Sequence, residues 1–345
     1  MIYLSHTGNR DIKKHDVPII LLAISVTVFF MQGLPVLSFF FAVPLFIVLF
    51  ICGEFSFIFS VFLVFFLEAG IVIFQNLKQG IAISNPNLLI ACCVPGFFIL
   101  PLLTVPVMKK MRLRYRLTVA GLLSATAWAC FFLISGTESF TALLTEFSQS
   151  AVDMLSSGLS PEAKTEMMNE ISSASLYPML RDVVTFSVLP TSIFLYAFDF
   201  IIAMRIIPKK ADRTLPVFRI IGFYNDSKMA IPLLGGMCGV IAAFVLKNRI
   251  LTIVSWNIVL SAALFFCVQG WGIFLFFGRI LVQKTGMPRF LLPIGILLLF
   301  VFIGYQYLFI LLAIVGAVEI FVPLRSRFNK TDIIDPTPGD DNDGK

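Results

Sequence analysis

Residues 55–75 read FSFIFSVFLVFFLEAGIVIFQ, an apolar run that contains a single charged residue, Glu68. A helix of about 20 apolar residues crosses the roughly 30 Å hydrocarbon core of a bilayer. The run therefore predicts a membrane-spanning helix. The rest of the chain has the same character, because 58% of its 345 residues are hydrophobic and 13% are charged, against about 25% charged in soluble proteins. This composition excludes a water-soluble fold and predicts an all-α, polytopic integral membrane helix bundle.

Similar apolar segments recur along the whole chain. The stronger ones are Phe55–Gln75, Leu88–Val107, Leu117–Ile134, Val183–Ile206 and Leu251–Ile280. The shorter ones are Val17–Gln32, Val36–Ile51, Ile231–Leu246, Phe290–Gly304 and Gln306–Val322. We predict about ten transmembrane helices from these segments. The alternative is eight, in which Val17–Ile51 is one broken helix kinked at Gly33 and Pro35, and Phe290–Val322 is a single long element. The first segment follows Lys13 and Lys14 as in a signal peptide, but no small-residue cleavage site follows, so we predict a retained helix.

The basic residues predict the orientation of the bundle, since Lys and Arg concentrate in cytoplasmic loops. With ten helices and a cytoplasmic N-terminus, all but five of the 26 basic residues lie on the cytoplasmic side. The exceptions are Lys78, Lys164, Arg181, Lys247 and Arg249. We therefore predict cytoplasmic N and C termini in the inner membrane of a bacterium. The net charge of +6 reflects this topology and not a nucleic-acid partner, because the basic loops are short and lack interleaved aromatic residues.

These features divide the chain into five parts. They are a cytoplasmic N-terminus at 1–16, membrane helices at 17–135, an extracytoplasmic loop at 136–182, membrane helices at 183–325 and a disordered cytoplasmic tail at 326–345. The 136–182 loop carries seven acidic residues against two basic ones, and its apolar residues recur at helical spacing. We expect two amphipathic helices there. They either pack on the headgroup side of the bundle, cover a cavity or hold a partner protein.

Ionisable residues at membrane depth are costly and mark candidate functional sites. Three acids qualify, namely Glu68, Asp199 and Glu319. Asp199 and Glu319 each precede an arginine by six residues, Arg205 and Arg325, so they either form helix-end ion pairs or contribute to a ligand site. Glu68 has no basic residue close to it in the sequence. It therefore pairs across helices, lines a wet cavity or is protonated, and we rate it the best candidate for a polar cavity.

Two amides in the segment Leu251–Ile280 are weaker candidates. Asn257 and Gln269 lie about 18 Å apart at helical rise, so they do not hold one ligand atom together. They either line one face or bond to a neighbouring helix. The six cysteines lack C-x-x-C spacing and neighbouring histidines, so we predict no metal and no cofactor. No Walker A, H-E-x-x-H or G-x-S-x-G motif occurs, and we predict that the protein is not an enzyme.

Several stretches have a familiar arrangement. They are Ala42-Val43-Pro44-Leu45, Leu189-Pro190 with Tyr196 and Asp199, Arg205-Ile206-Ile207-Pro208, Asn257 with Gln269-Gly270-Trp271-Gly272, and Gly316 with Glu319 and Arg325. Together they resemble the YybS-like family of uncharacterised bacterial multi-span membrane proteins. Glu319 stands where that family has Asp, and Asp199 where it has Asn. The general shape is also similar to that of the membrane-embedded substrate-binding subunits of energy-coupling-factor transporters. This resemblance implies a bacterial inner-membrane protein that binds a small solute and works with a separate ATPase.

Two functions follow as expectations from these observations. The first is a transporter or a membrane-embedded subunit that binds a small solute. Its candidate ligand-binding residues are Glu68, Asp199, Asn257, Gln269 and Glu319. The alternative is a non-transporting scaffold or envelope assembly factor that acts on envelope proteins through the 136–182 loop. In both cases the lipid bilayer is the main partner of the protein.

Overall fold

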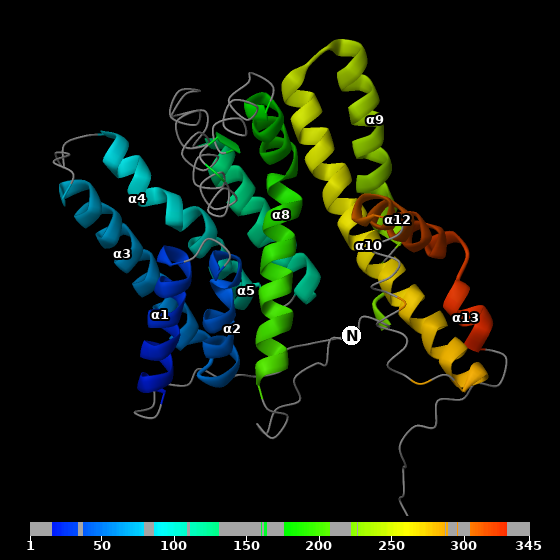
Figure 1. The fold of residues 1–345 in the computed structure, drawn as a ribbon, viewed down its shortest axis with the longest axis horizontal. Coiled ribbons are helices and arrows are strands. Elements are labelled where there is room, and N and C mark those ends of the chain that lie inside the picture. The colour runs from blue at the N-terminus through cyan, green and yellow to red at the C-terminus, as the bar shows by residue number, and fades with distance from the viewer. Residues whose placement is uncertain are drawn as a thin grey trace, which may run out of the picture. The chain divides into compact units, whose positions relative to one another are not determined.

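The computed structural model describes residues 16–33, 37–78, 86–108, 111–130, 176–207, 222–225, 227–286 and 304–329, with single positions elsewhere. Every regular element in these residues is a helix, and none is a strand (Figure 1). The all-α prediction is thus confirmed for the described part of the chain. The chain forms two compact units, Met1–Val217 and Phe218–Lys345.

The first unit consists of helices that follow the predicted apolar segments closely. In chain order they are α1 (Val17–Gln32), η1 (Leu37–Phe40), α2 (Ala42–Ile51), α3 (Glu54–Lys78), α4 (Pro86–Ile99), η2 (Leu100–Leu103), α5 (Thr104–Val107), a helix over residues 113–130 and α8 (Leu176–Ile206). The predicted segment Leu88–Val107 is divided between α4, η2 and α5. Prolines lack an N–H group, and Pro101 stands at the start of the 3-10 turn that interrupts this segment.

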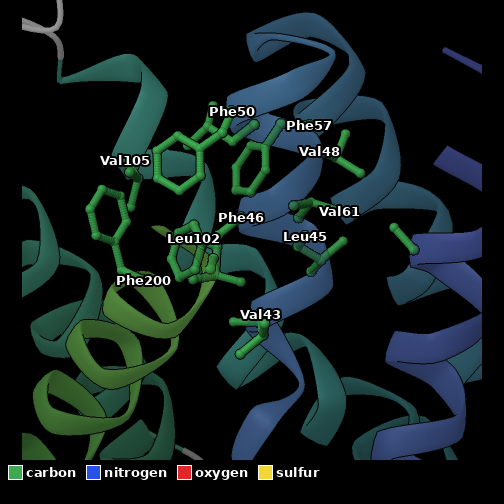
Figure 2. Packing of buried hydrophobic residues seen from close by; sticks show 14 of the residues in the cluster. Val43, Leu45, Phe46, Val48, Phe50, Phe57, Val61, Leu102, Val105 and Phe200 are labelled. Atoms are coloured by element: carbon green, nitrogen blue, oxygen red, sulfur yellow. The ribbon is translucent and has the colours of Figure 1, made fainter. Parts of the chain in front are cut away.

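The core of the first unit is built around α2. Helices α1, α3 and α8 all pack against it. From Ala42 to Phe50 every residue except Ile47 is buried. The Phe46 ring lies 6.1 Å from that of Phe57 on α3 and 5.2 Å from that of Phe200 on α8, measured between centroids (Figure 2). A helix that is apolar on all sides is buried on all sides. Helix α2 is therefore the internal support of the unit.

The second unit is a helical hairpin with a third helix packed on it. Its elements are η4 (Ser227–Met229), α9 (Ala230–Leu246), α10 (Arg249–Thr285), α12 (Tyr305–Phe321) and α13 (Leu324–Asn329). The α9–α10 turn is tight because Lys247 adopts a left-handed conformation (φ 49°). The Asn248 side chain then caps α10 by accepting a hydrogen bond from the Leu251 N–H at 3.1 Å. Helix α10 packs against both α9 and α12 (Figure 1).

Within the described residues, four stretches are long and apolar enough to cross a membrane. They are Glu54–Lys78, Thr185–Ile206, Ser227–Leu246 and Arg249–Thr285. Their outward surfaces carry large apolar side chains such as Phe66 (65% exposed) and Phe244 (85% exposed), as a lipid-facing surface requires. Shorter apolar helices cover Val17–Gln32, Leu37–Ile51, Cys92–Val107 and Tyr307–Phe321.

In the eight-helix alternative Val17–Ile51 is one broken helix, kinked at Gly33 and Pro35. In the structure α1 and α2 are separate helices that pack side by side (Figure 1). Val17–Ile51 therefore consists of two helical parts, and the number of membrane crossings stays a prediction. Most of the predicted segment Phe290–Gly304, the termini at 1–15 and 330–345, and all of the 136–182 loop except Ser160, Glu162, Ala163 and its last residues from 176 lie outside the described residues.

Candidate solute-binding groove and buried polar clusters

Glu68 is buried in the first unit, as its position within an apolar run predicts. It lies on α3, facing α1, and its side chain is 1% exposed. The Gln32 Nε2 group donates a hydrogen bond to Glu68 Oε2. Glu68 Oε1 has no hydrogen-bond partner among the described residues. The structure therefore contains a buried carboxylate that is satisfied on one oxygen only.

Gln32 links this carboxylate to the surface. It is the last residue of α1, where Gly33 leaves the helical conformation (ψ −121°). Because its amide nitrogen faces Glu68, its carbonyl oxygen faces the opposite way. That oxygen accepts a hydrogen bond from Gln75 Nε2 at 3.5 Å, which is a weak contact. Gln75 lies about two helical turns beyond Glu68 on α3.

A groove of about 510 Å³ runs between α1 and α3. It is lined by Ile24, Ser25, Val28, Phe29, Gln32, Leu67, Ile71 and Gln75. Ser25, Gln32 and Gln75 are all exposed, so three polar side chains face out from an otherwise apolar surface. Polar groups exposed to hydrocarbon are costly unless water, a ligand or a neighbouring chain satisfies them. The groove therefore offers these polar groups to water or to a small occupant that can form hydrogen bonds.

Asp199 does not form the helix-end ion pair that its spacing from Arg205 suggests. Its side chain is fully buried, whereas Arg205 is exposed. Asp199 Oδ2 accepts a hydrogen bond from the Ala42 N–H at 2.9 Å, at the N-terminus of α2. Six residues correspond to about 1.7 turns, so the two side chains lie on different faces of the continuous helix α8. Asp199 is therefore a cap for α2 supplied by a neighbouring helix.

Glu319 does form its predicted ion pair. Arg325 Nε donates to Glu319 Oε1, and Arg325 Nη2 donates to Glu319 Oε2, both at 2.6 Å. Glu319 is 2% exposed. Helix α12 ends at Phe321, and the chain turns through Val322 and Pro323 before α13 begins. This turn brings Arg325 back to a carboxylate that a continuous helix would have placed out of reach.

Gln269 joins the same cluster from α10. Its Nε2 donates to Glu319 Oε2 at 3.0 Å, and its Oε1 accepts from the Asn225 N–H at 2.9 Å. Asn225 Nδ2 donates in turn to the Phe265 carbonyl oxygen at 2.9 Å. Arg325 Nη2 also donates to the Phe223 carbonyl oxygen at 2.8 Å. The cluster thus ties α10, α12, α13 and the segment before α9 together, and Asn225 Oδ1 is its one buried side-chain atom without a hydrogen-bond partner among the described residues.

Two glycines allow α10 and α12 to approach closely beside this cluster. A Cβ atom on Gly270 would overlap the Leu312 carbonyl oxygen, and one on Gly316 would overlap the Phe266 carbonyl oxygen. Small residues at such contacts are typical of helix pairs in membranes. The Gln-Gly pair on α10 therefore has two roles, since Gln269 supplies the hydrogen bonds and Gly270 supplies the space.

The candidate residues separate into four places in the fold. Glu68 and Asp199 lie in the first unit at different positions, and Gln269 and Glu319 meet in the second. Asn257 lies apart from Gln269 and donates to the Ile253 carbonyl oxygen of its own helix at 2.9 Å. Gln32, Gln75 and Asn225 were missed from the sequence, because nothing distinguishes a glutamine or asparagine at a helix end from an ordinary surface residue.

No protein-family model, curated protein or solved structure matches the chain. In the part of the chain that the structure describes, no three His, Cys, Asp or Glu side chains gather as a metal site would require. In its described residues the chain is all-helical, with four helices long and apolar enough to cross a membrane. A groove with polar side chains lies between α1 and α3, near Glu68.

Proposed function

We propose that the chain is a multi-pass protein of the bacterial inner membrane that binds a small solute in the α1–α3 groove. It acts as a transporter or as the membrane-embedded solute-binding subunit of one. The observation that carries the proposal is Glu68, a buried carboxylate with one oxygen that has no hydrogen-bond partner among the described residues. It lies next to a groove whose lining includes the exposed Gln32 and Gln75. Buried ionisable groups inside a membrane most often serve a ligand or an ion pathway.

Glu319 supports the assignment by contrast, because it is neutralised by Arg325. Asp199 caps α2 through Oδ2, while its Oδ1, like Glu68 Oε1, has no hydrogen-bond partner among the described residues. Glu68 differs from Asp199 in lying beside a groove, behind Gln32. Glu68 has only the single amide donor of Gln32. A buried charge costs several kcal/mol of stability if no opposite charge lies beside it. We therefore infer that Glu68 is kept for a role other than stability.

The proposal includes ten membrane helices with both termini in the cytoplasm. The separation of α1 from α2 supports this count. The eight-helix alternative has a second difficulty, because losing one crossing at each end would place both termini opposite the basic loops in the middle of the chain. The protein does no chemistry of its own in this account, and energy for transport would come from a separate ATPase or from an ion gradient.

The proposal is tested by a solute screen on the purified full-length chain. Thermal unfolding in detergent is measured against a panel of vitamins, amino acids, amines and metal ions, and co-purifying solutes are identified by mass spectrometry. We expect at least one solute to raise the unfolding temperature. Ser25→Phe, which places a ring in the exposed groove, abolishes that shift. Thr191→Phe, at an exposed position of α8, is the matched control and leaves the shift intact.

Two results would contradict the proposal. One is the absence of a stabilising or co-purifying solute across the whole panel. The other is a stabilising solute whose effect is the same in the wild type and in Ser25→Phe, because its site would then lie outside the groove.

A further inference from the structure

We propose that the α1–α3 groove binds a primary ammonium group, with Gln32 as the contacting acceptor and Glu68 as the compensating charge behind it. This rests on the proposed function and names the chemical class of the solute. The argument has three steps. They are the orientation of Gln32, the absence of a basic side chain on Glu68 among the described residues, and the nature of the groove walls.

The orientation of Gln32 is fixed by Glu68. A carboxylate accepts hydrogen bonds, so it holds the Nε2 side of the Gln32 amide and turns the Oε1 side toward the groove. The present donor to that oxygen, Gln75 Nε2, is 3.5 Å away and therefore easy to displace. The groove thus presents a carbonyl oxygen that calls for an N–H or O–H donor.

An ionised Glu68 favours a cation over a neutral donor as the occupant. The sequence has no Lys or Arg from residue 15 to residue 77, and none from residue 79 to residue 108. Within that stretch only Lys78 remains, and its Nζ lies 5.8 Å from the Phe74 ring centroid, at the far end of α3. Arg116, the next buried basic residue, donates to the carbonyl oxygens of Val105 and Met111. The neutralising charge is therefore expected from the solute.

The groove walls accommodate a short hydrocarbon chain attached to that charge. Ile24, Val28, Leu67 and Ile71 are apolar, and the Phe29 ring is exposed and available to a cation. The volume of about 510 Å³ lies in the range of about 300–1,000 Å³ that is usual for small-molecule sites. A primary ammonium on a small alkyl body fits this combination of walls, acceptor and charge.

A primary ammonium has two sources in a membrane. One is a free amine from solution, and the other is the ethanolamine headgroup of a lipid. The chemistry that recognises the nitrogen is the same for both. The test therefore includes one arm for each source.

In the first arm the wild-type chain is placed in nanodiscs of phosphatidylglycerol, and butylammonium, butyltrimethylammonium and butanol are titrated. Saturable binding is expected for butylammonium, because it alone combines a charge with N–H donors. In the second arm phosphatidylethanolamine is added to the nanodiscs, and bound lipid is read by native mass spectrometry. Retention of phosphatidylethanolamine over phosphatidylcholine would identify the lipid as the source.

The variants assign the effect to named residues. Glu68→Gln keeps the shape of the side chain, and we expect it to weaken ammonium binding about 10- to 100-fold, as for the loss of a charge-assisted hydrogen bond. Gln32→Leu removes the acceptor and should weaken binding of the primary amine. Asp199→Asn is the control, because it neutralises another buried carboxylate of the same unit and should leave affinity unchanged. Unfolding temperatures confirm that each variant is folded.

Three outcomes would overturn the inference. Equal binding of butanol and butylammonium would remove the role of charge and would leave the proposed function in place with a neutral solute. Equal binding of the primary and quaternary ions would remove the role of Gln32. Failure of both arms, while the solute screen yields a ligand sensitive to Ser25→Phe, would show that the groove is occupied by another class of solute.

Discussion

At the scale of single residues, two acid–arginine pairs with the same spacing have different outcomes. Glu319 and Arg325 are six residues apart and form a double hydrogen bond, whereas Asp199 and Arg205 are also six apart and do not meet. The difference lies in the backbone between them. Helix α8 continues to Ile206, but α12 ends at Phe321 and the chain turns before Arg325. Spacing alone therefore does not determine an ion pair.

The Glu319–Arg325 pair yields a stability prediction. Arg325→Met leaves a buried carboxylate without its cation, and we expect a loss of about 3–5 kcal/mol in the free energy of unfolding. The double variant Glu319→Gln with Arg325→Met removes the stranded charge and should recover part of that loss. Unfolding in mixed micelles by denaturing detergent measures each value. A strictly additive cycle would contradict a direct interaction.

Asp199 yields a second prediction at the N-terminus of α2. Asp199→Leu removes the acceptor for the Ala42 N–H in a fully buried place, and we expect a loss of about 1–3 kcal/mol. Asp199→Asn retains an acceptor oxygen and should lose less. The same unfolding assay compares the two variants. If Leu and Asn have equal effects, the hydrogen bond to α2 does not contribute to stability.

At the scale of helices, the contact between α10 and α12 depends on two glycines. Gly270→Ala or Gly316→Ala places a methyl group against a backbone carbonyl of the opposite helix. A backbone carbonyl cannot move away as a flexible side chain can. We expect each to destabilise the second unit by about 1–3 kcal/mol, as overpacking does. Gly235→Ala on α9 is the matched control, because open space surrounds its Cβ position. A helical Gly→Ala change without a clash should be neutral or slightly stabilising. Equal losses at Gly270 and Gly235 would contradict the close contact.

The helices were well predicted from the sequence, because their length and apolar content are set locally. Val17–Gln32 matches α1 residue for residue, and the segments around α3, α9 and α10 agree to within a few residues. The internal position of α2 was not predicted. A short apolar run has no polar face to show whether it meets lipid or other helices.

The polar contacts were predicted less well than the helices. Glu68, Gln269 and Glu319 were identified, but their partners across helices were not. Such contacts depend on how each helix is rotated about its axis and on where the chain turns. Gln269 reaches Glu319 over a separation of 50 residues. No local pattern in the sequence specifies that rotation.

At the scale of the whole molecule, the positive-inside rule gives a prediction of topology. Single cysteines are introduced at the exposed Lys78, Lys247 and Lys284 in a chain whose six natural cysteines are replaced. A membrane-impermeant maleimide is added to cells that have lost their outer barrier but keep an intact inner membrane. It should label Lys78→Cys and Lys247→Cys. Lys284→Cys should react only after the membrane is permeabilised. Labelling of Lys247→Cys and Lys284→Cys from the same side would contradict α10 as a membrane-crossing helix.

The central claim is that the groove between α1 and α3 holds a solute above an uncompensated Glu68. An experimental structure by electron cryomicroscopy, with the chain purified from its native membrane into nanodiscs, tests this most directly. We predict a compact, non-protein feature between the two helices, in hydrogen-bond contact with Gln32 and with no Lys or Arg side chain on Glu68. A groove closed by side chains, or a Glu68 carboxylate paired with a basic residue of the same chain, would contradict the account.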